Sequence, residues 1–283
     1  MSVAAETLPR AGPSAAARAW RFVRHHVLTA YAILAFAYLL VPIAVVVAFS
    51  FNNPRGRFNY VWEGFTLDNW RNWDAVPGLV DAMKLSLQIA AISSLVATAL
   101  GTLIALALVR YGFRGRGATN LFIFLPMSTP EIVLGASLLA LFLNLHFSTG
   151  FLTIVIAHIM FNVSYVVVTV KARLVGFDRH LEEAAMDLGA NEWTTFRKVT
   201  LPLIAPAILA AALLTFALSV DDFVITYFNS GSEITFPLFV WGAATRGAPP
   251  QVNVMGTVIF VVALSLMAAN ILVQRRREVR APA

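Results

Sequence analysis

Six apolar runs separated by short polar stretches dominate this chain. They lie near residues 27–50, 85–109, 121–145, 151–171, 201–228 and 253–273. A helix needs about 20 predominantly apolar residues to cross the roughly 30 Å of hydrocarbon in a bilayer. The pattern therefore predicts an all-α membrane protein with six transmembrane helices, and residues 25–275 are expected to form its membrane domain.

The composition supports a membrane location and excludes sites that depend on cysteine. Hydrophobic residues make up 59% of the chain, and mean hydropathy is +0.74. Charged residues make up 13%, about half of the roughly 25% usual in soluble domains. Because the chain has no cysteine, disulfides and thiolate metal sites are excluded.

The two ends differ from the apolar middle. Residues 1–24 are rich in alanine and contain Pro9, Gly12 and Pro13, which predicts a disordered cytoplasmic tail. Basic residues before the first apolar run resemble the flank of a signal peptide, but the run is too long and lacks a clear cleavage site, so we expect it to remain a membrane helix. Residues 276–283 are expected to form a short basic cytoplasmic tail.

The basic residues indicate how the chain is oriented. An intracellular N-terminus places 16 of the 21 lysines and arginines on the cytoplasmic side and leaves five outside: Arg55, Arg57, Arg71, Lys84 and Arg246. Cytoplasmic loops of membrane proteins carry such an excess of basic residues. Both termini and the polar segment 181–202 are therefore predicted to be cytoplasmic.

The polar segment 181–202 lies between two apolar runs and predicts two short helices. Leu181 to Leu188 have helical spacing, and Gly189 suits the left-handed residue that ends a helix. Asn191 is expected to cap a second short helix. Together these elements predict a compact knob on the cytoplasmic surface, although an ordinary loop with a solvated acidic face is the simpler alternative.

The same segment resembles the EAA signature of permease subunits of ABC importers, which carry a MetI-like transmembrane domain. The match is ordered, with Val199 in place of the usual Ile, and it comprises Glu183, Ala184, Ala185, Gly189, Leu201 and Pro202. The resemblance implies a type I importer permease fold whose cytoplasmic coupling helices dock in a groove of a separate ATPase. Glu183 and Gly189 would lie at that contact.

Three acidic residues lie inside apolar runs that contain no lysine or arginine: Glu131, Asp221 and Asp222. An acid at the bilayer centre costs about 3 kcal/mol on insertion scales, so such residues usually face a cavity, a partner or a substrate. Their sign indicates a cationic cargo. Alternatively, Glu131 stays protonated or bonds a neighbouring helix, and the aspartate pair ends its helix at the headgroups.

The position of each acid along its run separates their roles. Glu131 lies roughly 15 Å from the inner start of its helix, near the midplane, whereas the aspartates lie about 30 Å along theirs, near the outer mouth. Pro126 and Pro130 precede Glu131 and remove backbone donors. They predict a kinked or unwound helix where this acid lies.

A wider resemblance covers roughly residues 25–275. It is to the second permease subunit of spermidine and putrescine importers, the PotC type, and rests on the segments FNNPRGRFNYVWEGFTLDNW, RYGFRGRG, MSTPEIVLGASLLALF, VSYVVVTVKARLVGFDRHLEEAAMDLGA and LSVDDFVITYF. It implies that Glu131, Trp70 and Trp62 take part in polyamine uptake. Anchoring at the membrane surface is the alternative for the two tryptophans.

A polyamine combines several ammonium groups with a flexible chain of methylenes. Its recognition needs separated carboxylates and aromatic faces. Glu131, Asp221 and Asp222, with Phe223 and Tyr227 nearby, supply both, so Tyr227 joins the predicted substrate pathway.

The resemblance also implies the partners. They are a second permease subunit in a heterodimer, a cytoplasmic ABC ATPase dimer, an extracytoplasmic polyamine-binding protein and membrane lipid, in the inner membrane of a bacterial cell. ATP and Mg would bind the ATPase. We expect no cofactor, metal or nucleic acid in this chain.

Other functions fit the sequence less well. The segment GFRGRGAT from Gly112 has the glycine spacing of a P-loop but Ala118 in place of the phosphate-binding lysine, and His146 and His158 are isolated. No catalytic constellation is found, so we do not expect an enzyme. A permease for a sugar or an anion, and a scaffold that docks an ATPase without transport, remain alternatives.

Overall fold

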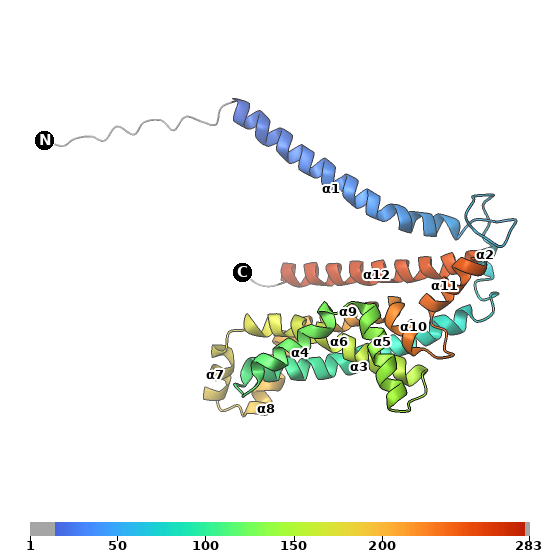
Figure 1. The fold of residues 1–283 in the computed structure, drawn as a ribbon. Coiled ribbons are helices and arrows are strands. Elements are labelled where there is room, and N and C mark those ends of the chain that lie inside the picture. Colours follow the sequence, from blue (N-terminus) through green and yellow to red (C-terminus); the bar gives the residue numbers. More distant parts are fainter. Residues whose placement is uncertain (1–14, 281–283) are drawn as a thin grey trace. The chain divides into compact units, whose positions relative to one another are not determined.

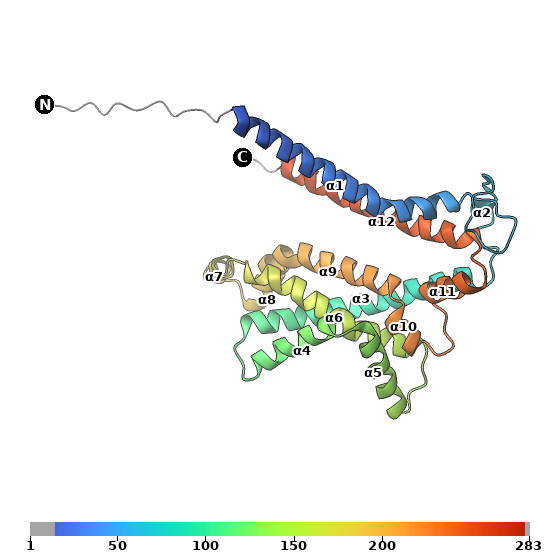
Figure 2. The same ribbon diagram turned by 45° about the horizontal axis from the view of Figure 1, so that its top comes forward.

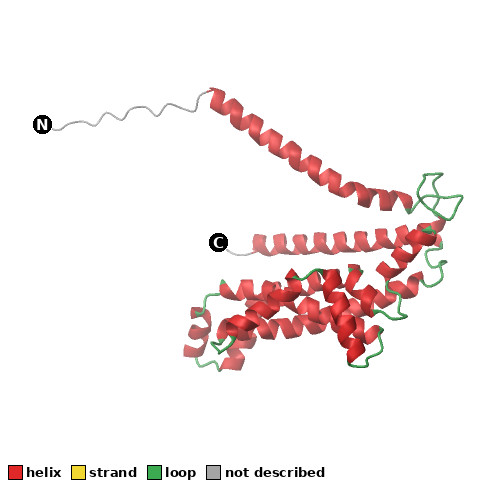
Figure 3. Cartoon of the chain, viewed as in Figure 1, coloured by secondary structure: helices red, strands yellow, loops and turns green. Residues whose placement is uncertain are grey.

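The computed structural model describes residues 15–280, with side chains described for residues 26–265 and for residue 268. Helices joined by loops make up this part of the chain (Figure 3), and its one β feature is an isolated bridge between Asn52 and Phe65. The predicted all-α class is confirmed. The chain divides into two compact units, Met1–Trp73 with Pro249–Ala283 and Asp74–Ala248.

The first unit contains two long helices. Helix α1 spans Ala15–Phe49 and α12 spans Pro250–Arg280, and they pack against each other (Figure 2). At Gly256 an added Cβ would lie 3.4 Å from the side chain of Val46, so this glycine sits at the contact. Helix α1 begins inside the segment predicted as a tail, while residues 1–14 and 281–283 lie outside the described residues.

In the first unit, the loop that follows α1 is stabilised by hydrogen bonds of buried asparagines. Asn52 Nδ2 donates to Asn59 Oδ1 at 2.7 Å, and Asn69 of the short helix α2, Asp68–Arg71, donates to the carbonyl oxygens of Ser50 and Asn52. Buried amides are stable only when hydrogen-bonded. This loop therefore has a defined conformation.

The second unit contains the remaining helices, shown in Figure 1. They are α3 (Leu79–Arg110), α4 (Arg116–Ser128), α5 (Glu131–Asn144), α6 (Phe151–Val175), α7 (His180–Asp187), α8 (Glu192–Thr195), the π-helical turn η1 (Phe196–Thr200), α9 (Leu201–Asp221), α10 (Val224–Asn229) and α11 (Phe236–Arg246). Helices α3, α6 and α9 pack together around a core that includes Leu108, Val166, Val170 and Ile204. Many of their other apolar side chains are exposed, such as Leu95 and Leu209, as expected for surfaces that face lipid.

Four described helices are long and apolar enough to span a membrane: His26–Phe49, Leu79–Arg110, Phe151–Val175 and Glu192–Asp221. The bent pair α4 and α5 would form a fifth span. The last predicted run lies in α12, whose apolar part, Pro250–Ser265, is shorter. Every predicted apolar run is thus helical, and the arrangement is consistent with six spans.

Two of the predicted spans are broken. Helix α4 ends at Ser128 and α5 begins at Glu131, with a bend of 109° between them, so the predicted break beside Pro130 is confirmed. The run predicted near 201–228 is also broken, because α9 ends at Asp221 and α10 begins at Val224. The helix thus ends at the aspartate pair, as in the alternative left open for these residues. Both breaks place acidic residues at helix ends.

Gly101 allows α3 and α6 to approach closely. A Cβ at this position would lie 2.6 Å from the Cβ of Val166, a distance that forces the helices apart. We expect Gly101→Ala to destabilise the protein by about 1–3 kcal/mol through overpacking, measured as a lower melting temperature of the purified complex in lipid nanodiscs. Gly112→Ala is the matched control, since its Cβ would meet nothing within 4 Å; equal melting temperatures for the two variants would contradict this packing role.

Candidate functional site

The EAA segment folds as predicted up to its second helix. Helix α7 ends at Asp187, and Gly189 has the left-handed φ of +89°. The Oδ1 atom of Asn191 accepts a hydrogen bond from the backbone N–H of Thr194 at 2.8 Å, which caps α8. The prediction of a separate second helix is wrong, however, because α8 continues through η1 into α9.

Motif residues lie mainly on the surface of this segment. Glu183, Ala184 and Gly189 are exposed and Ala185 is half-buried, and Leu201 and Pro202 at the start of α9 are also exposed. Two large apolar side chains join them there: Leu188 is 90% exposed and Trp193 is 68% exposed. Exposed apolar side chains next to polar ones are typical of an interaction surface.

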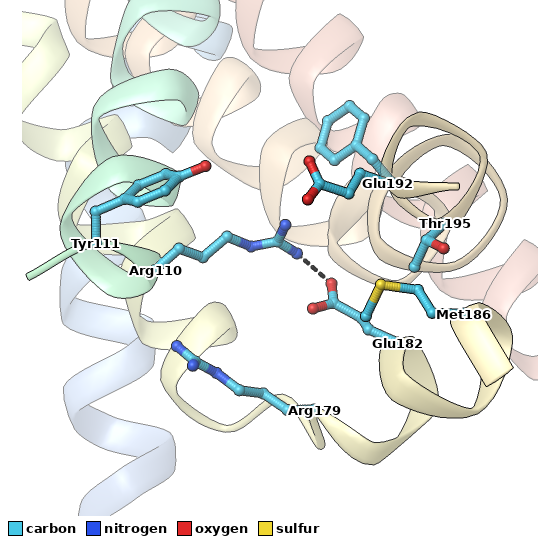
Figure 4. A pocket seen from close by; sticks show the side chains of 8 residues that line it. Arg110, Tyr111, Arg179, Glu182, Met186, Glu192 and Thr195 are labelled. Atoms are coloured by element: carbon cyan, nitrogen blue, oxygen red, sulfur yellow. Dashed lines mark hydrogen bonds and ion pairs between the residues drawn. The ribbon is translucent and has the colours of Figure 1, made fainter. Parts of the chain in front are cut away.

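Glu182, next to the motif, was missed by the sequence analysis. Its carboxylate forms an ion pair with Arg110 at the end of α3 and accepts a hydrogen bond from the hydroxyl of Thr200 in η1. Figure 4 shows Arg110 and Glu182 pointing toward each other. Arg179 adds a second link by donating to the carbonyl oxygen of Val109 at 3.0 Å. These bonds fix α7 to the ends of α3 and α9.

A pocket of about 260 Å³ lies beside this ion pair (Figure 4). It is bounded by α3, α7 and α8, and it is lined by Arg110, Tyr111, Arg179, Glu182, Met186, Glu192, Thr195 and Phe196. Charges of both signs line it in equal number. It therefore presents no net charge to select a charged small molecule.

Asp178 contacts His180, the first residue of α7. Its Oδ1 accepts from the backbone N–H of His180 at 3.0 Å and contacts His180 Nδ1 at 2.6 Å. The hydrogen bond from His180 lowers the pKa of Asp178, and the same bond raises the pKa of His180. The pair therefore stabilises the start of α7 most at a pH above the pKa of Asp178 and below the pKa of His180. This stabilisation is lost when the pH falls through the lowered pKa of Asp178, and also when the pH rises through the raised pKa of His180.

Glu131 lies at the first position of α5, directly after the break, and its side chain is exposed. Tyr165 of α6 lies within electrostatic reach of this carboxylate. The break therefore presents an accessible acidic group at the start of α5.

Asp221 and Asp222 have different environments. The side chain of Asp222 is 9% exposed, and its Oδ2 accepts from the backbone N–H and the hydroxyl of Thr226, both at 2.8 Å. Its carboxylate therefore satisfies a backbone N–H in the first turn of α10. Asp221 is exposed, so the two adjacent aspartates differ in exposure and in hydrogen bonding.

An aromatic cluster on α10 and α11 follows Asp221 in the chain. The ring centroids of Phe223 and Tyr227 are 5.6 Å apart, and those of Phe223 and Trp241 are 5.3 Å apart. Tyr227 and Trp241 are 57% and 58% exposed. Trp241 was not among the predicted site residues.

Trp62 and Trp70 belong to the first unit, where each contacts an aromatic ring near the end of α1. Trp70 stacks on Phe51 with centroids 5.3 Å apart and donates from Nε1 to Ser50 Oγ, while Trp62 meets Phe49 edge-on at 6.3 Å. Trp70 is half-buried and Trp62 is 49% exposed. Trp70 therefore helps to hold its loop together, and Trp62 keeps more of its ring accessible.

A metal site is not formed by the described residues, among which no three His, Asp or Glu side chains could hold a metal ion. The glycine-rich segment after α3 leads into α4, with Gly115 in a left-handed conformation just before Arg116. This segment therefore forms the N-terminal end of α4.

Sequence relatives match nearly the whole chain. A spermidine/putrescine transport system permease protein of Haemophilus influenzae is 39% identical over 90% of this chain and 99% of its own length. The corresponding protein of Escherichia coli K12 is 40% identical over 85% and 90%. A putrescine transport system permease protein of the same organism is 39% identical over 80% and 83%.

Solved structures support the fold. The chain resembles a bacterial ABC transporter involved in the import of the acidic polysaccharide alginate, with a TM-score of 0.62 at 18% identity over 93% of this chain and 98% of the other. It also resembles the MetNI methionine transporter in an inward-facing conformation, with a TM-score of 0.56 at 19% identity over 70% and 95%.

The profile of one family matches residues 97–279, which include both broken spans and the EAA segment. Together with the near full-length relatives and the apolar helices, this match establishes a multi-pass membrane protein. The chain belongs to the family of inner membrane components of binding-protein-dependent transport systems.

Proposed function

We propose that this chain is a transmembrane permease subunit of an ATP-driven importer that takes up polyamines, spermidine or putrescine, by alternating access. The observation that carries the proposal is the near full-length similarity to permeases named for these two cargoes. The proposed membrane domain is residues 25–275, and both termini are cytoplasmic.

The chemistry of the second unit supports a cationic cargo. Glu131 and Asp221 are both exposed and both lie where a helix breaks. The aromatic cluster of Phe223, Tyr227 and Trp241 follows Asp221 in the chain, and an ammonium group over an aromatic face gains about 0.5–2 kcal/mol. In our proposal Glu131, Asp221 and Tyr227 contact the cargo in the pathway. Trp62 and Trp70, in the segment that follows α1, also contribute to polyamine uptake.

The exposed surface of the EAA segment supports docking of a separate ATPase subunit. Its exposed residues Glu183, Ala184 and Gly189, with Leu188 and Trp193, form the proposed docking surface for a cytoplasmic ABC ATPase dimer. ATP and Mg bind that ATPase, and this chain is the pore subunit. A second permease chain and an extracytoplasmic polyamine-binding protein complete the complex.

Uptake by the reconstituted complex tests this function. Proteoliposomes would contain both permease chains and the ATPase, with ATP trapped inside and the binding protein outside. We expect labelled spermidine or putrescine to enter only with ATP, and unlabelled polyamine to compete where a sugar or sulfate does not. Uptake that needs no ATP would refute the mechanism, and ATPase stimulation by a neutral or anionic solute would refute the cargo.

A further inference from the structure

A chain of buried polar side chains crosses the second unit at the break between α9 and α10. His158 of α6 is only 3% exposed; its Nδ1 lies 2.6 Å from Ser219 Oγ, and its Nε2 lies 3.2 Å from Asp222 Oδ2. Ser219 Oγ lies 3.1 Å from Ser93 Oγ of α3. Helices α3, α6, α9 and α10 are therefore linked through this histidine.

The hydrogen-bond directions follow from the chemistry of the groups. An ionised carboxylate only accepts, so His158 Nε2 carries the hydrogen that faces Asp222. The same Nε2 lies 3.0 Å from Thr226 Oγ1, whose own hydroxyl donates to Asp222 Oδ2. Asp222 thus receives bonds from His158 of α6 as well as from the first turn of α10.

This arrangement fixes the backbone at the break. Asp222 has extended backbone angles, φ −63° and ψ 119°, and its carboxylate also faces the N–H of Ile225 at 3.4 Å. A carboxylate in this buried position would be costly without partners. His158 therefore favours the conformation in which α9 stops at Asp221 and the next carboxylate turns inward.

A consequence for Asp221 follows from its neighbour's orientation. Consecutive residues point about 100° apart on a helix, so turning Asp222 into the unit leaves Asp221 on the surface of α9. The aromatic group of Phe223, Tyr227 and Trp241 begins just beyond the same break. The position of Asp221 relative to these rings thus depends on the bond between His158 and Asp222.

We propose that His158 is a positioning residue for cargo recognition. By holding Asp222 it sets the α9–α10 break and leaves Asp221 as the one aspartate of the pair that contacts the cationic cargo. This inference rests on the proposed function for the identity of the cargo. The exposure of the two aspartates, however, can be tested without any cargo.

A matched pair of amide substitutions tests the role of His158. The side-chain amide of His158→Gln reaches the position of Nε2 and keeps a donor toward Asp222, whereas that of His158→Asn reaches only the position of Nδ1. We expect His158→Asn to raise the half-saturating polyamine concentration about tenfold, with the maximal uptake rate and the yield of assembled complex retained. His158→Gln should remain near the wild-type value. Equal half-saturating concentrations for the two variants would overturn the proposal.

Thiol labelling provides a second test that does not depend on the histidine variants. Since the chain has no cysteine, D221C and D222C each introduce a single thiol into this chain, and labelling is read on this chain after it is separated from its partners in the complete complex. We expect a small cationic methanethiosulfonate reagent to label D221C about tenfold faster than D222C, in line with the difference in exposure. Equal labelling rates would overturn the proposal.

The uptake assay keeps the exposure of the two aspartates distinct from the identity of the cargo. If labelling distinguishes D221C from D222C but the wild-type complex takes up no spermidine or putrescine in proteoliposomes, the difference in exposure at the α9–α10 break stands and the proposed polyamine cargo is refuted.

Discussion

Replacing Glu131 with glutamine is expected to lower ATP-driven polyamine uptake at least about tenfold, a loss of roughly 1.4 kcal/mol or more in cargo interaction. Glutamine keeps the size and hydrogen-bonding capacity of glutamate and removes the negative charge. Since Glu131 is exposed at the start of α5, its loss should affect cargo more than packing. Uptake of labelled spermidine by proteoliposomes would measure the effect.

Glu131→Asp is the matched control for this experiment. It keeps the charge and the position at the N-terminus of α5, and shortens the reach by one methylene. We expect Glu131→Asp to transport clearly better than Glu131→Gln, with both variants assembling at the wild-type yield. Wild-type transport by Glu131→Gln would show that the negative charge of Glu131 does not contribute to uptake.

Features that depend on neighbouring residues in the chain could be predicted from the sequence. Pro126 and Pro130 remove backbone donors, and α4 and α5 separate beside Pro130. Gly189 has the left-handed conformation that ends α7, and Asn191 caps the next helix. In each case the conformation follows from the residue's own backbone preference or from a bond to a residue three positions away.

Features that depend on distant residues could not be predicted in this way. The bond between His158 and Asp222 joins residues 64 positions apart, and the ion pair between Arg110 and Glu182 joins residues 72 positions apart. Each pair forms only when two elements that are distant in the chain pack together. Counting lysines and arginines alone therefore missed the partner of Asp222, which is a histidine.

These distant contacts change how the acidic residues are interpreted. A row of three equivalent acids would suggest one continuous cationic pathway. The carboxylate of Asp222 instead contacts His158 and accepts hydrogen bonds from Thr226, whereas Glu131 and Asp221 are exposed. A similar division occurs in the EAA segment, where Glu182 holds α7 to α3 and Glu183 stays exposed for the proposed ATPase contact.

Gly189→Val is expected to abolish coupling between the ATPase and transport. A β-branched residue with φ of +89° is strained, and the left-handed conformation costs roughly 1–2 kcal/mol for an ordinary L-residue. An added Cβ would meet nothing within 4 Å in this chain, so the effect would come from the backbone and not from a clash. Relief of the strain should reorient α7 and remove the docking surface around Glu183.

Gly189→Asn provides the control for this conformational argument, because asparagine tolerates the left-handed region. The uptake rate of Gly189→Val should fall at least about tenfold. The amount of ATPase that copurifies with this chain should fall as well. Gly189→Asn should keep most of both activities despite its larger side chain. If both variants lose the ATPase equally, the side chain itself blocks docking and the backbone explanation is wrong; normal copurification and transport by Gly189→Val would argue against docking at this turn.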